Sequence, residues 1–584
     1  MYIALILKGP EKMLKTIRKI FTYFGVLLKK YIFIYCILIF FSIISEMLLL
    51  IPTFVNGKII DMVLIKDFER IIKYLAISLI IYIFNGVLSL FETYLHVFLF
   101  QKTLLDFKTM LCEKIVCLKM EEFDKRSSGE YLERLDSDTS TICSFYINTF
   151  PNLIINIIKL VGTGILSIYL SPLLALIGIL SFPVSLTINL YFGKKMKRIY
   201  STVRKSADEL TSISQQIING EKTIKGLNIE NTVLKRYKSK AQDYFKINLS
   251  SGMLSAYGGL VQTIISTIFE LVIIAVASHF IISGKLSIGA YISFNVYLSK
   301  FLSALRNIAS TNLNIQTVIV STDRISKIFS QENENFVHKL PKPEIYGDIK
   351  IEKLEFSYKN NQKILDKINT SFSKNSVTAI VGASGSGKTT MLNLLVRFYE
   401  SEGNILIDGH KISAISIDTL RNLISYIQQD SFFFKDTIKN NLNIVNPNAT
   451  DEEIEKVCKK AEIYHKIINL PNGFNTMMGE NASILSGGEK QRLAIARGLL
   501  KKAKVFLFDE VTSNLDGETE KKILKTLLQL GEEYTVIIIA HRLTLVENIP
   551  RIIVLDKGRV VGEGEHNYLL STCKEYQRLF KKID

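Results

Sequence analysis

Apolar residues are distributed very differently in the two halves of this chain. The first half consists mainly of long runs of Ile, Leu, Phe and Val, whereas the second half has short apolar runs between polar stretches. A helix needs about 20 predominantly apolar residues to cross a bilayer. We therefore predict six membrane-spanning helices in the first half, at about 31–54, 71–100, 145–170, 172–192, 255–283 and 288–310.

The polar connections between these runs indicate where helices continue outside the membrane. The connection at 171–172 is very short and predicts a tight turn at the outer surface. The connections at 101–144 and 193–254 are long, charged and helical in spacing. At a rise of about 1.5 Å per residue they are long enough for helical hairpins that extend tens of ångströms into the cytoplasm. We expect sharp turns at 127–130 and 219–221, with ordinary surface loops as the alternative interpretation.

The second half predicts a separate domain. A polar segment with two prolines, 327–347, is typical of a domain boundary. From Asp348 onward, short apolar runs alternate with amphipathic helical segments, which is the pattern of a layered α/β domain. The predicted organisation is therefore an α-helical transmembrane domain over 1–330, a linker over 331–347 and an α/β domain over 348–584.

The positions of the charges decide what the formal net charge of +17 means. Lys and Arg crowd into the N-terminal segment and into 194–246, whereas the connections at 171–172 and 283–287 carry only Lys285. This asymmetry favours a membrane protein with a cytoplasmic N-terminus over a nucleic-acid-binding protein. Residues 1–30 then predict a basic amphipathic helix on the membrane surface. We expect a multi-pass cell-membrane protein without a cleavable signal and with no nucleic-acid partner.

One stretch of the second half carries a specific nucleotide-binding pattern. A buried strand predicted at 377–381 leads into a glycine-rich turn, and residues 391–399 then have helical spacing. The turn matches G-x-x-x-x-G-K-[ST] in the strand–loop–helix context that a phosphate loop requires. Its backbone N–H groups are expected to cradle phosphates, with Lys388 on the β- and γ-phosphates and Thr389 on Mg²⁺. The predicted nucleotide-binding residues are Gly382, Ala383, Ser384, Gly385, Ser386, Gly387, Lys388, Thr389 and Thr390.

A second pattern is an apolar strand, 505–510, that ends in two acids. We expect this strand to lie next to the phosphate strand, which brings Asp509 to the Mg²⁺ side of the nucleotide. Glu510 is then placed to orient or deprotonate the attacking water, so we assign it as the catalytic base. Two acids that simply begin a turn are the alternative, which the phosphate loop upstream disfavours.

A third pattern, Leu485–Arg492, begins a helix with Ser-Gly-Gly and so provides a second anion-binding terminus. One nucleotide does not need two such termini from one chain. The pattern makes sense if two such domains face each other head to tail and each closes on the γ-phosphate held by the other. The residues assigned to this contact are Ser486, Gly487, Gly488 and Glu489. His541 follows another apolar strand and is a further candidate for a γ-phosphate contact.

Together these motifs resemble those of ABC transporters of the exporter type, as a half-transporter with one membrane domain and one nucleotide-binding domain. The resemblance covers nearly the whole chain. Residues 382–389 resemble the Walker A motif, and 506–510 resemble Walker B with its catalytic glutamate. Residues 485–489 resemble the ABC signature, which the family usually writes with glutamine where this chain has Glu489.

The resemblance implies roles for further residues. Gln429 aligns with the glutamine that senses Mg²⁺ and the membrane domain, with the neighbouring Gln428 as an alternative register. His541 aligns with the family's switch histidine, and Tyr358 aligns with the aromatic residue that stacks on adenine. The implied catalytic residues are Glu510, His541 and Gln429, and the implied metal ligands are Thr389, Gln429 and Asp509.

The resemblance also implies ATP-driven export by alternating access, with ATP and Mg²⁺ as cofactors. Segments 123–138 and 220–230 resemble the two coupling segments that rest on the nucleotide domains. Intact motifs favour a homodimer, while pairing with a different half-transporter remains open. The implied substrate is a peptide, a lipid or a hydrophobic small molecule. An ATP-gated channel or regulator is the alternative function, whereas the six apolar runs argue against a soluble ABC ATPase.

Charged groups inside the predicted spans are the candidates for substrate contact, because such groups are costly in a bilayer. Lys159 and Glu270 are both expected near the middle of the membrane, either as a pair or lining a substrate cavity. A purely structural ion pair is the alternative. Further candidates are Glu46, Glu92 and His96.

Overall fold

The computed structural model describes residues 10–334, 346–358, 363–479, 482–512, 515–540 and 543–581. The chain divides into two compact units, Met1–Glu113 with Ser128–Ser330 and Lys114–Ser127 with Gln331–Asp584. The change of unit after Ser330 lies at the predicted end of the membrane domain. Segment 114–127 belongs to the second unit, although the predicted membrane domain included it.

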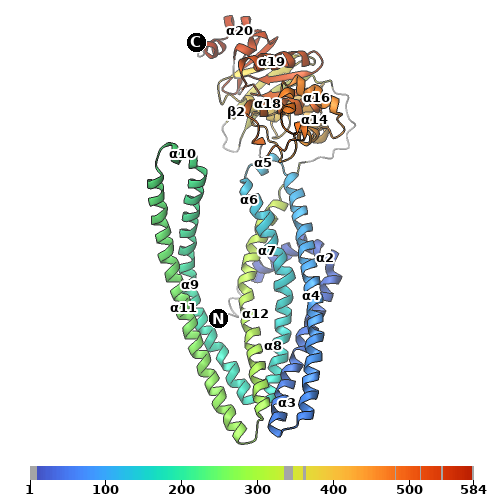
Figure 1. Ribbon diagram of the computed structural model, residues 1–584. Coiled ribbons are helices and arrows are strands. Elements are labelled where there is room, and N and C mark those ends of the chain that lie inside the picture. The colour runs from blue at the N-terminus through green and yellow to red at the C-terminus, as the bar shows by residue number, and fades with distance from the viewer. Residues whose placement is uncertain are drawn as a thin grey trace. The chain divides into compact units, whose positions relative to one another are not determined.

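The first unit is helical throughout its described part (Figure 1). Long α-helices alternate with short helical pieces, two of which are π-helical turns labelled η1 and η2. The elements are α2 (Pro10–Leu48), α3 (Leu50–Ile65), α4 (Phe68–Val116), α6 (Ser128–Glu133), η1 (Arg134–Asp138), α7 (Thr139–Ser144), η2 (Phe145–Thr149), α8 (Phe150–Leu170), α9 (Pro172–Asn219), α10 (Glu221–Gly226), α11 (Glu230–Ile282) and α12 (Ile288–Phe329).

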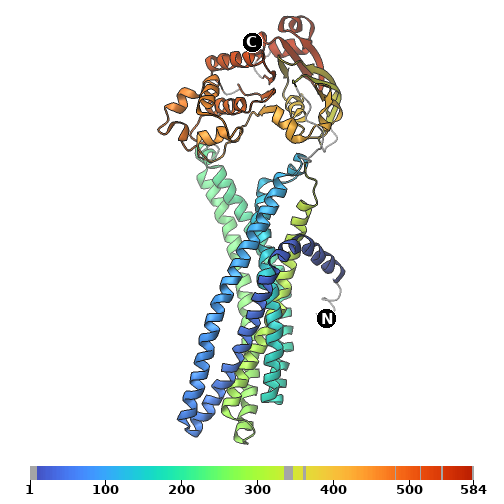
Figure 2. The ribbon, with the colours of Figure 1, turned by 90° about the vertical axis from the view of Figure 1, so that its right-hand side faces the viewer.

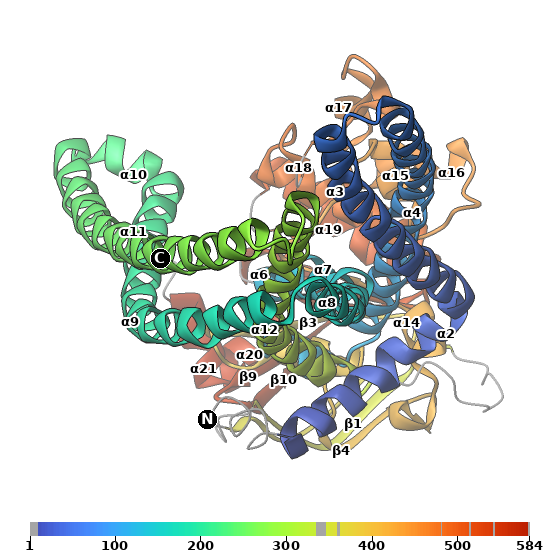
Figure 3. The same cartoon turned by 90° about the horizontal axis from the view of Figure 1, so that it is seen from below.

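Helices α9 and α11 pack against each other along their length and carry α10 at their tip (Figure 1). Viewed along the bundle, this pair lies away from α3 and α4 (Figure 3), while α9 also packs against α8. Helix α12 packs against α8 and α3. The first part of α2 runs across the bundle before the helix turns along it (Figure 2). That transverse segment falls within the amphipathic surface helix predicted for residues 1–30, whose position on a membrane stays a prediction.

Among the described residues, five helical stretches are long and apolar enough to cross a membrane: Lys29–Ile65, Phe68–Val116, Ser128–Leu170, Pro172–Asn219 and Glu230–Ile282. They contain the first four predicted spans in full and the fifth, 255–283, as far as Ile282. The sixth, 288–310, lies in the 42-residue helix α12, which is not among the five stretches. Polar residues interrupt the apolar character of α12, namely Asn295, Lys300, Arg306 and Asn307. A sixth crossing therefore stays a prediction.

The predicted helical hairpins are confirmed, because α4 continues to Val116 and α9 continues to Asn219 before the chain reverses. The first turn lies earlier than expected. The reversal occupies 117–127 and Ser128 already begins α6, whereas the sequence suggested 127–130. The short helix α5 (Met120–Phe123) lies within this reversal and is bound to the second unit, which explains the difference.

The described part of the second unit contains two β-sheets. A four-stranded antiparallel sheet has the order β2-β1-β4-β5, and a six-stranded sheet has the order β10-β9-β3-β8-β7-β6. In the larger sheet only β10 runs antiparallel to its neighbour. The strands are β1 (Ile349–Ser357), β2 (Lys363–Phe372), β3 (Val377–Gly382), β4 (Glu402–Ile407), β5 (His410–Lys411), β6 (Ile424–Ile427), β7 (Val505–Asp509), β8 (Thr535–Ile539), β9 (Arg551–Asp556) and β10 (Arg559–Gly564).

Helices cover the sheets of this unit, as the alternating pattern predicted. Besides α5, the described α-helices of this unit are α13 (Lys388–Leu395), α14 (Ile417–Leu423), α15 (Ile438–Asn443), α16 (Asp451–Lys460), α17 (Tyr464–Ile468), α18 (Gly487–Leu500), α19 (Gly517–Leu530), α20 (His566–Thr572) and α21 (Lys574–Lys581). The predicted α/β fold class is therefore confirmed. Helix α13 ends earlier than the helical spacing to residue 399 suggested, because Arg397 adopts a left-handed conformation with φ 54°.

Strand β3 lies at the centre of the larger sheet and is buried on both faces, as parallel strands usually are. Val377, Ala379 and Val381 face one hydrophobic core, while Ile380 faces the other. This alternation follows from the two-residue period of a strand. The phosphate loop that follows β3 therefore starts from a rigid position.

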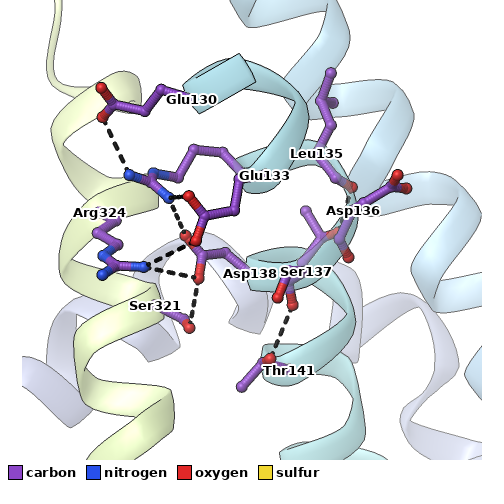
Figure 4. A network of polar contacts seen from close by, with 11 residues as sticks. Glu130, Glu133, Leu135, Asp136, Ser137, Asp138, Thr141, Ser321 and Arg324 are labelled. Atoms are coloured by element: carbon purple, nitrogen blue, oxygen red, sulfur yellow. Dashed lines mark hydrogen bonds and ion pairs between the residues drawn. The ribbon is translucent and has the colours of Figure 1, made fainter. Parts of the chain in front are cut away.

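A network of ion pairs joins η1 to the last turns of α12 within the first unit (Figure 4). The Arg134 side chain is only 9% exposed and lies 3.2 Å from both Glu133 and Asp138, and its other terminal nitrogen donates to Glu130 at 3.1 Å. Asp138 also accepts a hydrogen bond of 2.7 Å from Ser321 and lies 3.8 Å from Arg324. The network is a fixed link between the helix that follows α5 and the end of α12.

Candidate nucleotide site

The glycine-rich loop between β3 and α13 has the backbone geometry that phosphate binding requires. Gly385 and Gly387 have φ angles of 81° and 102°, a conformation that side chains other than glycine rarely adopt. At Gly382 a Cβ atom would lie 2.2 Å from the Leu555 carbonyl oxygen and 2.7 Å from Ser386 Oγ. The loop thus depends on its glycines, and it leads directly into the N-terminus of α13, whose dipole favours anions.

Lys388 lies within this loop. Its ammonium donates hydrogen bonds to the carbonyl oxygens of Gly382 at 2.8 Å and Ala383 at 3.0 Å. Burial lowers the pKa of Lys388, and the negative charges of Glu510 and Asp509 oppose that shift. Ser386 Oγ is buried and has no hydrogen-bond partner among the described residues. A buried ammonium and an unpaired hydroxyl inside a glycine cradle fit a phosphate ligand.

Asp509 is the last residue of β7, which lies two strands from β3 in the sheet. Its side chain nevertheless contacts Thr389 at the end of the phosphate loop. Its carboxylate accepts hydrogen bonds from the Thr389 hydroxyl at 3.2 Å and from the Tyr426 hydroxyl at 3.1 Å. Burial raises the pKa of Asp509, and these two hydrogen bonds oppose the shift. A hydroxyl beside a carboxylate is a hard oxygen donor set, which suits Mg²⁺.

The expected adjacency of β7 and β3 is wrong, because β8 lies between them. Asp509 still reaches Thr389, since the strands run parallel and their carboxyl ends meet at one edge of the sheet. Residues at strand ends of such a sheet are brought together whether or not their strands are neighbours.

Glu510 is held in an unusual backbone conformation beside Gln429. Its φ is 51°, a strained value for a residue other than glycine, and its N–H donates to the Ile539 carbonyl at 3.2 Å. Gln429 Nε2 donates to Glu510 Oε2 at 2.9 Å. Gln429 is thus held beside Glu510, and its role as a metal ligand stays a prediction.

Tyr358 lies at the end of β1 and is 39% exposed. Its ring packs edge-on against Phe356 and Tyr399, with centroid distances of 4.8 and 5.3 Å. Its hydroxyl lies 3.5 Å from Thr390 Oγ1, which places the ring beside the phosphate loop. The exposed ring is therefore available for stacking on a base.

Sequence reasoning missed Tyr399, which connects this ring to α5. The Tyr399 hydroxyl donates a hydrogen bond of 2.5 Å to Asp124, directly after α5. Lys119, at the other end of α5, forms an ion pair of 2.6 Å with Glu332. These contacts bind α5 to the nucleotide unit, and no local sequence pattern reveals them because the partners are far apart in the chain.

The Ser-Gly-Gly pattern begins α18 as predicted, with Ser486 as the N-cap. Ser486 and Gly487 are exposed. No hydrogen bond or ion pair joins residues 486–489 to the phosphate loop in the described part of the chain. His541, a predicted catalytic residue, lies outside the described residues.

The expected pairing of Lys159 with Glu270 is wrong. Lys159 on α8 instead lies 2.9 Å from Glu46 on α2, while Glu270 is exposed on α11. Helix α8 packs against α2, which explains the choice of partner. Glu92 is half-buried and His96 lies one turn further along α4. Whether any of these residues contacts a substrate stays a hypothesis.

The fold and the site define a membrane domain joined to a P-loop ATPase domain. Residues 35–305 match the family model of the ABC transporter transmembrane region, and residues 365–513 match the family model described as ABC transporter. The chain is 30% identical to the ATP-dependent lipid A-core flippase of Syntrophus aciditrophicus over 524 residues, which cover 89% of this chain and 87% of the flippase.

A second relative is the pediocin PA-1 transport/processing ATP-binding protein of Pediococcus acidilactici. It is 32% identical over 528 residues, which cover 89% of this chain and 73% of that protein. The structure of a bacterial Atm1-family ABC exporter with ATP bound superposes with a TM-score of 0.77 at 25% identity, covering 95% of this chain and 98% of that one. The chain belongs to the ABC transporter family. It is an ATP-hydrolysing membrane transporter of the exporter type.

Replacing Lys388 by Ala should weaken ATP binding about ten- to hundredfold, because the ligand loses a charge-assisted hydrogen bond inside a buried loop. Titration of the purified protein with a fluorescent ATP analogue measures this. Lys374→Ala, at an exposed lysine in the turn before β3, is the matched control and should bind like the unmodified protein. Equal affinity of the two variants would contradict the assignment of Lys388.

Proposed function

We propose that two copies of this chain form an exporter in a bacterial cell membrane that uses ATP hydrolysis to move a peptide, a lipid or a hydrophobic small molecule outward. The observation that carries this proposal is the cluster at the carboxyl edge of the large sheet. There Thr389 binds Asp509, and Gln429 binds Glu510, beside the phosphate loop. This combination of a hydroxyl, two acids and an amide supports ATP hydrolysis with Mg²⁺.

The residues of this cluster have distinct roles in the proposed reaction. Lys388 and the loop N–H groups hold the phosphates, and Tyr358 stacks on adenine. Thr389, Asp509 and Gln429 would hold Mg²⁺, and the ion would supply positive charge that offsets the charge of the phosphates. Glu510 accepts a proton from the attacking water as the bond to the γ-phosphorus forms and the bond to ADP breaks. His541 contributes a further γ-phosphate contact.

The second copy supplies the other side of each nucleotide site in this proposal. The tip of α18 is exposed and makes no described contact with the phosphate loop of its own chain. Ser486, Gly487, Gly488 and Glu489 would then meet the ATP held by the partner. Closure of the two nucleotide units would move α5 through its contacts with Tyr399 and Glu332, and alternating access would follow from that movement.

The substrate class rests on the relatives and on the polar residues of the first unit. One relative is named as a lipid A-core flippase and another as a pediocin transporter, which supports a lipid or a peptide as cargo. Lys159 and Glu46 form an ion pair, and Lys300 donates to the Leu49 carbonyl at 3.1 Å, so α2, α8 and α12 place charged groups close together. Charged groups within predicted membrane spans support a route for a polar part of the cargo.

ATPase activity of this chain alone, reconstituted in lipid nanodiscs, tests the proposal. Steady Mg²⁺-dependent hydrolysis by a particle that contains two copies is the expected result. ATP binding without hydrolysis would contradict the homodimer and favour a different half-transporter as partner. Candidate lipids and peptides are then compared by how much they stimulate the hydrolysis rate.

A further inference from the structure

The signature helix α18 carries a negative charge in its first turn. Glu489 and Ser486 form a reciprocal capping box, in which Glu489 Oε2 accepts from the Ser486 N–H at 2.8 Å and Ser486 Oγ accepts from the Glu489 N–H at 3.3 Å. The capping box holds the tip of the helix rigid. It also places a carboxylate beside Gly487 and Gly488, where the proposed function brings the phosphates of the partner's ATP.

Lys466 compensates this carboxylate. Its ammonium lies 3.0 Å from Glu489 Oε1, the oxygen that the capping box does not use. The Glu489 side chain is only 15% exposed and the Lys466 side chain is 42% exposed. Burial raises the pKa of Glu489, but the hydrogen bonds from Ser486 and Lys466 outweigh it and hold the pKa below its ordinary value. Glu489 is therefore ionised at neutral pH.

The position of Lys466 is well defined by its helix. Lys466 lies in α17, whose flanking Ile463 and whose Ile467 are fully buried in the larger hydrophobic core. The ammonium thus comes from an element other than α18 and is directed at the signature tip. An uncompensated, partly buried carboxylate at this tip would repel a triphosphate, because charges in a poorly solvated site interact more strongly than they do in water.

We propose that Lys466 is a positioning residue for ATP hydrolysis. The Lys466 ammonium neutralises the charge of Glu489, so that the tip of α18 accepts the triphosphate of the nucleotide held by the second copy. This inference rests on the proposed function, because it needs the signature tip to meet the partner's ATP. It also gives Glu489 and Lys466 complementary roles. The glutamate keeps the capping box, and Lys466 removes the electrostatic penalty.

The test is a double-mutant cycle on the full-length protein in lipid nanodiscs. Lys466→Met should raise the KM for ATP about three- to tenfold with a smaller change in kcat, because the variant leaves the Glu489 charge unpaired. The same substitution in a Glu489→Gln background should change the KM less than about 1.5-fold, because no charge remains to be neutralised. Raising the salt concentration should reduce the effect of Lys466→Met, since salt screens charge repulsion.

Lys456→Met is the control, because Lys456 is an exposed lysine on α16, outside α17 and α18. It should leave the KM unchanged in both backgrounds. Lys466→Gln repeats the cycle if Lys466→Met reduces the yield of folded protein. An equal effect of the Lys466 substitution in both backgrounds, or no effect in either, would overturn the inference. Failure of the proposed function is distinguishable, because it shows as absent hydrolysis by the unmodified protein.

Discussion

Replacing Glu510 by Gln should lower the rate of ATP hydrolysis at least about 10²-fold while ATP binding is retained. The substitution removes the group that accepts a proton from the attacking water but keeps the shape of the side chain. The new amide oxygen still accepts the hydrogen bond that Gln429 donates at 2.9 Å to the carboxylate. Gln and Glu have side chains of the same shape, so we expect the backbone at position 510 and the fold of the site to be preserved.

Phosphate release at saturating ATP measures the rate in nanodiscs, and the fluorescent ATP titration measures binding. Glu532→Gln is the control, because Glu532 is an exposed acid beyond the end of α19. It should hydrolyse ATP at the unmodified rate. If Glu510→Gln hydrolyses ATP at that rate as well, Glu510 is not the catalytic base. If the variant loses ATP binding, the residue acts in nucleotide binding and not in the chemical step.

The second large effect concerns stability. Replacing Arg134 by Met should destabilise the first unit by about 3 kcal/mol, because removal of one partner leaves buried charge uncompensated. The Asp138 side chain is 4% exposed and lies 3.2 Å from the Arg134 guanidinium, so its carboxylate loses its main counter-charge. A lower melting temperature of the purified protein in detergent measures this loss.

Arg324→Met is the matched control within the same network (Figure 4). Arg324 is 42% exposed and lies 3.8 Å from Asp138, so its removal should cost about 1 kcal/mol or less. Adding Asp138→Asn to Arg134→Met should recover part of the stability, since the unpaired charge is then removed. Equal melting temperatures for Arg134→Met and Arg324→Met would show that burial of the network does not contribute in this way.

The predictions that rest on local sequence patterns are correct, whereas the wrong predictions concern which distant segments pair with each other. The phosphate loop, the strand before it and the acids of β7 are patterns within a few residues, and the structure shows each element where the pattern indicated. The strand order is different, because β8 enters between β3 and β7 only when distant segments assemble. Lys159 likewise pairs with Glu46, because α8 packs against α2 in the assembled fold.

The sequence by itself determined the membrane domain, the α/β domain and the nucleotide motifs, because hydrophobic period and glycine placement act locally. Only the tertiary structure decided that α5 belongs to the nucleotide unit, that Tyr399 links Tyr358 to Asp124, and that Lys466 faces Glu489. Each of these contacts joins segments separated by loops or whole domains. Their energies depend on packing and desolvation in the assembled fold, which no local pattern records.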